Sequence, residues 1–310
     1  MGAIISHSFI FIYKLFIFNF LLKLLSIEFK VNNRYILIMY GFLIKKSFCD
    51  AWDNLLSVIV TNLLCLFTGV GVLLLSATIF KSFSESSSQN LQNLVVVLIF
   101  ALVCIIYSIF AFAYGELSAK IANFEGVHLL DFFKEIPGVL KDALLFALMI
   151  VAIVIISSFC IEYYFAPNRS MVSYFVGALL IWMDVFFILA LQWFIPIRSL
   201  MHNNFKKCLK KCFIVFFDNT GFSIFMAFYN LVMIVLSVFF VGFVPSLAGI
   251  LITDTNAMRL RLYKYDYLEE HPELKTKKER KQIPWEELLY DDKETLGPRN
   301  FKSFFFPWRE

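Results

Sequence analysis

Charged residues are scarce in this sequence. Lys, Arg, Asp and Glu make up 17% of the 310 residues and hydrophobic residues make up 60%, whereas about a quarter of an average soluble domain is charged. The chain also contains 38 Phe residues, more than the core of one water-soluble domain can bury. This composition excludes an ordinary water-soluble protein.

Motifs for familiar catalytic chemistry are missing as well. The sequence has no glycine-rich phosphate-binding loop, no His-Glu-x-x-His zinc motif and no Ser-centred nucleophile elbow. Cys208, Cys212 and His202 offer three soft ligands, but a structural zinc site uses four, and the neighbouring lysines oppose a cation. We therefore predict no enzymatic activity, no metal and no cofactor. Nucleic acid is not expected as a partner, because no basic extramembrane domain with stacking aromatics is present.

A disulfide framework is not expected either. The six cysteines mostly fall in apolar stretches, where a cysteine behaves as a small buried hydrophobic residue.

Long apolar runs are abundant. A helix needs about 20 predominantly apolar residues to cross a bilayer, and these runs lack the alternation of barrel strands. We predict an all-α integral membrane protein with about six transmembrane helices. The expected spans are residues 55–80, 91–113, 143–165, 171–197, 219–241 and 246–262.

A ten-residue pattern precedes two of these runs. Residues 45–54 (KKSFCDAWDN) and 210–219 (KKCFIVFFDN) share Lys, Lys, Phe, Asp and Asn at matching positions, and residues 134–142 resemble a weaker third copy. In each copy, charged and apolar residues occupy opposite arcs of a helix, which is typical of an interfacial amphipathic helix. The pattern predicts three repeated units, each an interfacial helix followed by a helical hairpin. The basic side chains expected to face lipid headgroups are Lys45, Lys46, Lys206, Lys207, Lys210 and Lys211.

Basic residues gather on one side of the six-span arrangement. The opposite loops carry only Lys81 and Arg169. Because basic loops stay in the cytoplasm, we expect a cytoplasmic C-terminus and a bacterial inner-membrane location. The predicted parts are an apolar extension at 1–38, either an extra span or untranslated before Met39, a membrane domain at 39–263, and a cytoplasmic polar tail at 264–310.

Two polar residues interrupt the fourth predicted span. Asp184 lies in its middle, and Gln192 lies eight residues further on, roughly on the same helical face. An ionisable residue at that depth is by default a functional hypothesis. The alternative is a structural bond from Asp184 to Asn62, Asn230 or another polar group. We place the structural alternative first, because no basic or histidine partner lies within the spans.

The polar tail contains a short amphipathic segment. Residues 284–295 place Trp285, Leu288 and Leu289 on one stripe, with acidic residues around them. A helix this short needs a packing surface, either on this chain or on a partner protein. Phe305 and Trp308, in the apolar C-terminal end, are also expected to dock.

Two stretches resemble the YesL-like family of bacterial integral membrane proteins. They are KKSFCDAWDNLLSVIVTNLL at 45–64 and GFVPSLAGILITDTNAMRLRLYKY at 242–265, and the resemblance covers residues 42–265. It implies several spans entered through an amphipathic segment, and an association with carbohydrate uptake systems. It supplies no catalytic residues, and the extension at 1–38 and the polar tail depart from the family pattern.

These features together favour a non-enzymatic accessory or scaffold protein of a membrane transport system. Its expected partners are the lipid bilayer and membrane subunits of that system. The alternative is a small transporter or channel whose pathway uses Asp184 and Gln192.

Overall fold

The computed structural model describes residues 33–84, 88–167, 169–274, 276, 279–281 and 283–299. These residues form helices and connecting segments, with no strand among them. The helices are α2 (Asn33–Asp53), α3 (Leu55–Ser84), α4 (Gln89–Ala122), α5 (Asp131–Tyr164), α6 (Met171–Leu191), α7 (Phe194–Met201), α8 (Phe205–Asp218), α9 (Thr220–Phe239), α10 (Ser246–Glu270), η1 (Glu279–Lys281), α11 (Trp285–Leu288) and α12 (Tyr290–Leu296). The prediction of an all-helical protein is confirmed for this part of the chain.

The chain divides into two compact units. Unit 1 combines Met1–Lys45 with Leu262–Glu310, and unit 2 is Lys46–Arg261. Helices α2 and α10 each contribute residues to both units, and the two units are described separately below.

Five described helical segments are long and apolar enough to cross a membrane. They are Leu55–Lys81, Asn90–Ala122, Asp131–Tyr164, Met171–Met201 and Thr220–Phe239. They match five of the six predicted spans and fit a membrane-embedded protein. The sixth predicted span, residues 246–262, forms the first part of α10, which is not among the five. Polar side chains from Thr253 to Arg261 break its apolar character.

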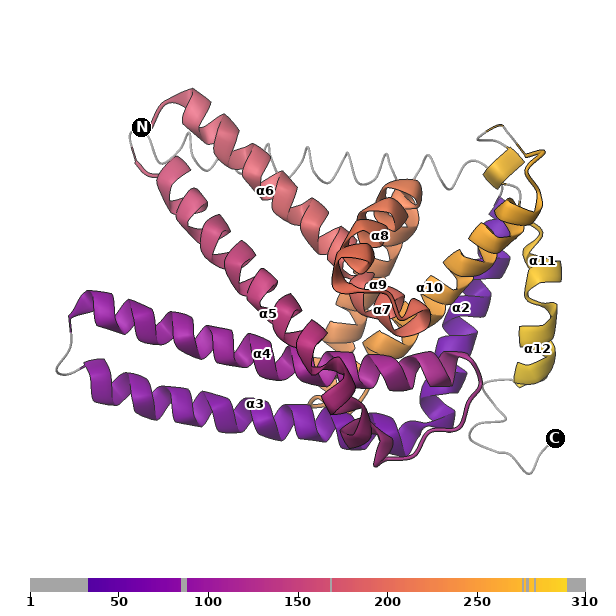
Figure 1. Cartoon of the computed structure of the whole chain (residues 1–310), viewed down its shortest axis with the longest axis horizontal. Coiled ribbons are helices and arrows are strands. Elements are labelled where there is room, and N and C mark those ends of the chain that lie inside the picture. The colour runs from indigo at the N-terminus through magenta and orange to yellow at the C-terminus, as the bar shows by residue number, and fades with distance from the viewer. Residues whose placement is uncertain are drawn as a thin grey trace. The chain divides into compact units, whose positions relative to one another are not determined.

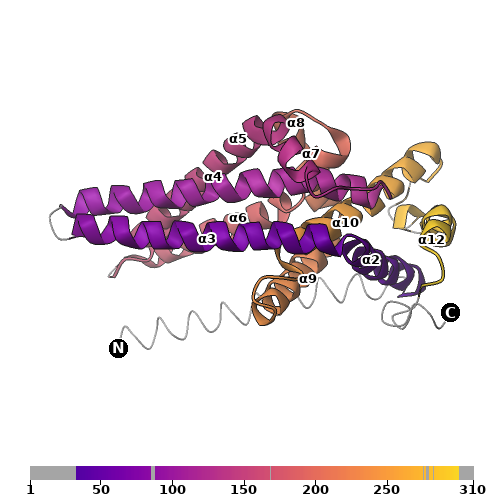
Figure 2. The ribbon, with the colours of Figure 1, turned by 90° about the horizontal axis from the view of Figure 1, so that it is seen from below.

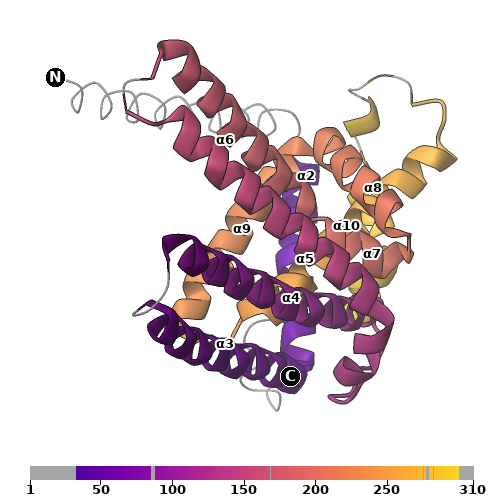
Figure 3. The same ribbon diagram turned by 60° about the vertical axis from the view of Figure 1, so that its left-hand side comes forward.

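Two helical hairpins make up much of unit 2, α3 with α4 and α5 with α6 (Figures 1 and 2). In the first hairpin the Tyr107 hydroxyl donates to the carbonyl oxygen of Cys65 at 3.1 Å, and a Cβ atom at Gly69 would collide with that hydroxyl. In the second, a Cβ atom at Gly177 would collide with the ring of Phe165. These glycines let the paired helices approach closely. The loop ends of the two hairpins lie well apart (Figure 3).

The core of unit 2 is aromatic where α4, α5, α7 and α8 meet. The ring centroid of Phe194 lies 5.8 Å from that of Phe112, 5.0 Å from that of Phe146 and 4.9 Å from that of Phe205. Aromatic pairs of this kind contribute about 0.5–1.5 kcal/mol each. This cluster anchors the bases of the two hairpins to each other.

A single asparagine separates one helix from a following candidate span at two places. Asn54 lies between α2 and α3, and Asn219 lies between α8 and α9. The Asn54 amide donates to the carbonyl oxygen of Asp50 at 2.9 Å, and the Asn219 amide donates to that of Val215 at 3.3 Å. Both bonds reach back four residues, so the two copies of the predicted ten-residue pattern end with the same local geometry.

Several large apolar side chains of unit 1 are buried. Trp285 and Leu289 of the tail are buried, as are Phe42 and Leu43 of α2, and Leu288 is half-buried. The predicted single helix at 284–295 is instead two short helices, α11 and α12, because the chain turns at Leu289.

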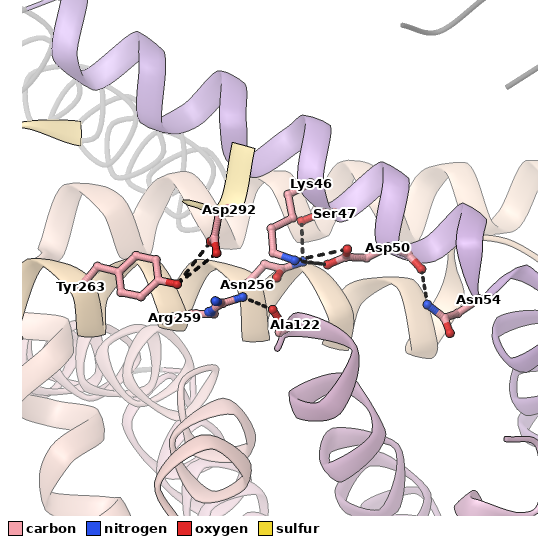
Figure 4. A network of polar contacts seen from close by, with 9 residues as sticks. All are labelled: Lys46, Ser47, Asp50, Asn54, Ala122, Asn256, Arg259, Tyr263 and Asp292. Atoms are coloured by element: carbon pink, nitrogen blue, oxygen red, sulfur yellow. Dashed lines mark hydrogen bonds and ion pairs between the residues drawn. The ribbon is translucent and has the colours of Figure 1, made fainter. Parts of the chain in front are cut away.

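Three polar features complete the description of unit 1. The Tyr263 hydroxyl lies 3.3 Å from both carboxylate oxygens of Asp292, and the ammonium of Lys45 lies 3.5 Å from the carbonyl oxygen of Gly297 (Figure 4 shows the Tyr263 contact). Gly297 has φ 73° and follows the last residue of α12, a positive φ that glycine commonly adopts just after a helix. Phe305 and Trp308 lie outside the described residues, so their docking stays a prediction.

Candidate functional site

Helix α10 is the most polar long helix of unit 2 and is nearly fully buried there. Its residues from Leu251 to Ala257 are all buried, and they include the polar run Thr253, Asp254, Thr255 and Asn256. Burying a polar group costs free energy unless the group is hydrogen-bonded. The hydrogen bonds and ion pairs around α10 therefore determine how the cost of burying its polar run is offset.

Asn256 joins α10 to an ion pair on α2. Its amide donates to Asp50 Oδ2 at 2.7 Å, and the ammonium of Lys46 lies 3.2 and 3.0 Å from the two oxygens of the same carboxylate (Figure 4). Lys46 is 2% exposed and Asp50 is 5% exposed. Burial raises the pKa of Asp50, and the ammonium of Lys46 and the amide of Asn256 partly oppose that rise.

The prediction that Lys46 faces lipid headgroups is wrong. Its side chain points into unit 2, where Asp50 neutralises it and the ring of Phe124 lies 3.7 Å from the ammonium. Lys46 and Asp50 of the predicted charged arc thus lie on a buried face of α2, whereas Asp53 of the same arc is exposed. The helical wheel identified this arc correctly but could not show that a carboxylate, an amide and an aromatic ring would compensate its burial.

Arg259 extends this cluster to the end of α4. Its guanidinium donates to the carbonyl oxygen of Ala122, the last residue of α4, and lies 5.3 Å from the ring centroid of Phe124 (Figure 4). A cation at a helix C-terminus interacts favourably with the partial negative charge there. Phe124 therefore has a cationic side chain from α2 and another from α10 against its ring.

Asp254 joins α10 to α9. The amide of Asn230 donates to both oxygens of the Asp254 carboxylate, at 2.8 and 3.1 Å. Burial raises the pKa of Asp254 to about 7, against the lowering effect of the Asn230 hydrogen bond. The other polar atom of that amide, Asn230 Oδ1, is buried and has no hydrogen-bond partner among the described residues.

Asn62 of α3 holds the turn that leads into α10. Its amide donates to the carbonyl oxygens of Phe243 and Pro245 at 2.8 and 2.9 Å, and its Oδ1 accepts from the backbone N–H of Ala248 at 3.0 Å. Three hydrogen bonds from one buried side chain therefore hold this turn.

A second ion-pair cluster connects α4, α5 and α7. Arg198 pairs with Glu116, donates from Nε to Asp142 Oδ2 at 3.1 Å, and donates to the carbonyl oxygen of Gly138 at 3.3 Å. Arg198 lies on α7 with only 13% of its side chain exposed, because two carboxylates from other helices surround it.

The structure does not bring Asp184 and Gln192 together. Asp184 accepts from the Ser157 hydroxyl at 2.8 Å, which joins α6 to α5 within one hairpin. Gln192 donates to the carbonyl oxygen of Ser223 at 3.0 Å, which joins the end of α6 to α9. No bond links the two residues in the described part of the chain. Asn62, Asn230 or another polar group was expected to bond Asp184. The partner is another polar group, the hydroxyl of Ser157.

The remaining predicted lysines lie on α8. Lys206, Lys207 and Lys210 are exposed, and Lys211 is half-buried with its ammonium 3.4 Å from the sulfur of Met201. On the opposite face of the helix, Cys208 and Cys212 are buried. Within the described ranges, no group of three or more His, Cys, Asp or Glu side chains could hold a metal ion.

Sequence reasoning missed the polar contacts of α10 as a group. Asp254 and Asn256 lie in a stretch that looked apolar enough to be a sixth span, and Glu116 lies near the end of the second. The available signal was the run Thr253-Asp254-Thr255-Asn256, since four consecutive polar residues within a predicted span are expensive in hydrocarbon.

Comparisons with protein-family models, with curated proteins and with solved structures found no match.

Proposed function

We propose that this chain is a non-enzymatic membrane protein that serves as an accessory or scaffold subunit of a membrane transport system. The observation that carries the proposal is the separation of Asp184 and Gln192. Each ties α6 to a different helix, Asp184 to α5 and Gln192 to α9, so both act as links between helices.

The other buried charges have structural partners too. Lys46 pairs with Asp50, and Arg198 pairs with Glu116 and Asp142. Arg198 connects α7 to α4 and α5, and the Lys46–Asp50 pair of α2 is bonded to α10 through Asn256. Such links between helices stabilise a rigid framework. In contrast, the hairpins expose large apolar side chains along their length, among them Phe67, Leu73, Phe159 and Phe175. Such surfaces suit lipid or the membrane helices of a larger assembly.

The finer features of the proposal are a repeat and an orientation. The matching bonds of Asn54 and Asn219 support repeated units that each start with a surface helix and continue into a span. The exposed lysines of α8 support a cytoplasmic position for that helix in a bacterial inner membrane. We propose the same side for the tail. From the resemblance to the YesL-like family, we propose that the transport system takes up carbohydrates.

The alternative function is a small transporter that uses Asp184. It is favoured by one observation, the position of a half-buried carboxylate within a candidate span. In this mechanism the carboxylate would take up and release a proton or a cation.

Reconstitution separates the two functions. Vesicles containing only the purified full-length chain should show no flux of protons, cations or small sugars above that of empty vesicles. A flux that is present with the native chain and abolished in a well-folded Asp184→Asn variant would overturn the scaffold proposal in favour of the transporter.

Cross-linking in cells tests the scaffold directly. A photo-crosslinking amino acid at Phe159, on the exposed face of α5, should capture a membrane subunit of a transport system, identified by mass spectrometry. Loss of the chain should lower uptake through the same system. The matched control is the same amino acid at Tyr290, an exposed residue of the tail. If uptake is unchanged without the chain, the proposed role is wrong.

A further inference from the structure

The exposed face of α8 changes character along the helix. Lys207, Lys210, Ile214 and Phe217 follow one another at spacings of three and four residues, so they form one stripe on the helix surface. All four side chains are exposed; Ile214 is 52% exposed and Phe217 is 67% exposed. The stripe is basic in its first half and apolar in its second half. We call these four residues the α8 stripe.

The opposite face of α8 is fixed to unit 2. Phe213 packs edge-on against Phe187 of α6 with ring centroids 5.7 Å apart, and Phe216 lies 5.9 Å from Phe186. Cys208 and Cys212 are fully buried on this side. Because the helix is anchored in this way, the α8 stripe cannot roll inward to hide Ile214 and Phe217.

The end of α8 leads directly into a candidate span. Asn219 alone separates α8 from α9, whose span begins at Thr220. The apolar half of the stripe is therefore the half next to the hydrocarbon, and the lysines are further from it. A helix that descends into the headgroup region in this direction places its ammonium groups beside lipid phosphates and its last apolar side chains against the acyl chains.

We propose that the α8 stripe is a binding surface for anionic phospholipid. The lysines recognise the negative headgroup, while Ile214 and Phe217 contact the acyl chains of the same leaflet. This inference is independent of the proposed transport role, since it requires only the described geometry of α8. An acidic soluble protein would complement the lysines but would leave the apolar half of the stripe without a matching surface.

Native mass spectrometry of the full-length protein in detergent tests the proposal. The protein is titrated with phosphatidylglycerol and, separately, with phosphatidylcholine, and the affinities for the two lipids are compared. We expect a preference for phosphatidylglycerol. Each basic residue near an anionic surface strengthens binding about fivefold, so the double variant Lys207→Gln/Lys210→Gln should reduce this preference on the order of 25-fold.

The matched control removes the same charge elsewhere. Lys81 at the far end of α3 and Lys293 on α12 are both exposed, and the double variant Lys81→Gln/Lys293→Gln should keep the native preference. Equal loss in both double variants would show a general charge effect and would overturn the proposal. So would an unchanged preference in the α8 variant, because all substituted side chains are at the surface and both variants should fold.

A third variant tests the apolar half. Ile214→Ser/Phe217→Ser should lower the affinities for both lipids by similar factors and leave the ratio of the two affinities unchanged, since acyl chains are common to both lipids. A soluble polyglutamate peptide provides the competing partner. If the peptide binds with a dependence on Lys207 and Lys210 while phosphatidylglycerol does not, the surface recognises protein and the proposal is wrong.

Discussion

Helix α10 and the two hairpins reverse the burial pattern of a water-soluble protein, which buries apolar side chains and exposes polar ones. The polar run of α10 is buried in unit 2, whereas the apolar helices α3 to α6 expose leucine, valine and phenylalanine along most of their length. In water this arrangement would be unstable, because exposed apolar area is unfavourable. In a bilayer it is expected, since lipid tails are as apolar as leucine and give helices no hydrophobic reason to associate.

The difference shows which contacts hold unit 2 together. Close packing at Gly69 and Gly177 joins helices within each hairpin, while polar bonds join α10 to α2, α3, α4 and α9. Hydrogen bonds between membrane helices are individually modest, averaging about 0.6 kcal/mol in double-mutant cycles. Breaking one partner of a buried charge pair costs much more, because the other charge stays behind.

The largest expected effect comes from breaking the ion pair beside α10. Asp50→Ala removes the carboxylate that pairs with the buried ammonium of Lys46 and should lower the free energy of unfolding by about 3–5 kcal/mol. The free energy is measured by denaturant titration in mild detergent. Asp53→Ala, an exposed carboxylate on the same helix, is the control and should have little effect.

A double variant sharpens that result. Lys46→Met/Asp50→Leu removes both charges and should be more stable than Asp50→Ala, since no lone charge remains. If Asp50→Ala and Asp53→Ala unfold alike, the buried ion pair does not hold α2 to α10.

The next effect depends on pH and concerns Asp254. Its pKa is about 7 in the folded protein, against an ordinary value of 3.8 for an aspartate, so between these values the folded state keeps a proton that the unfolded state has already released. Stability should therefore fall as pH rises from about 4 to about 7, by a few kcal/mol at about 1.4 kcal/mol per pKa unit, and then level off.

Asp254→Asn isolates this contribution. The variant keeps the shape of the side chain but carries no titrating group, so its melting temperature should depend less on pH over this range than that of the native chain. An identical pH profile for both proteins would show that Asp254 does not titrate in this way.

The smallest effect is expected on the hairpins. Leu73 of α3 is 69% exposed, and Leu73→Ala should change the free energy of unfolding by less than about 0.5 kcal/mol. Leu251 of α10 is 5% exposed, and Leu251→Ala should cost about 2–5 kcal/mol because it leaves a cavity. Equal costs for these two identical substitutions would contradict the contrast between α10 and the hairpins.

Local patterns in the sequence predicted the helices well. The five candidate spans are continuous apolar runs. In hydrocarbon no water can bond the backbone, so a run of this kind satisfies its backbone hydrogen bonds by forming a helix. The breaks at Asn54 and Asn219 also follow the local repeat. The stop at Gly297 has a local cause too, since glycine readily adopts a positive φ.

The candidate site was harder to predict because its partners are distant in the sequence. Asp50 and Asn256 are 206 residues apart, and Asn62 lies 186 residues from the N–H of Ala248 that it accepts from. The lysines illustrate the same limit. Lys46 and Lys211 occupy equivalent places in the two copies of the ten-residue pattern, yet Lys46 is buried and Lys211 is only half-buried.

The sequence by itself determined that the protein is helical and fits a membrane, and it determined the positions of the five candidate spans, because these properties depend on the apolar content of short windows. Only the tertiary structure decided which polar side chains face inward. That choice depends on whether groups distant in the sequence come close enough to offset the cost of burial. The ring of Phe124 lies against Lys46, and Asn256 of α10 bonds Asp50, the partner of Lys46 on the same helix, whereas Lys207 and Lys210 remain at the surface, where the charge is available for a lipid headgroup.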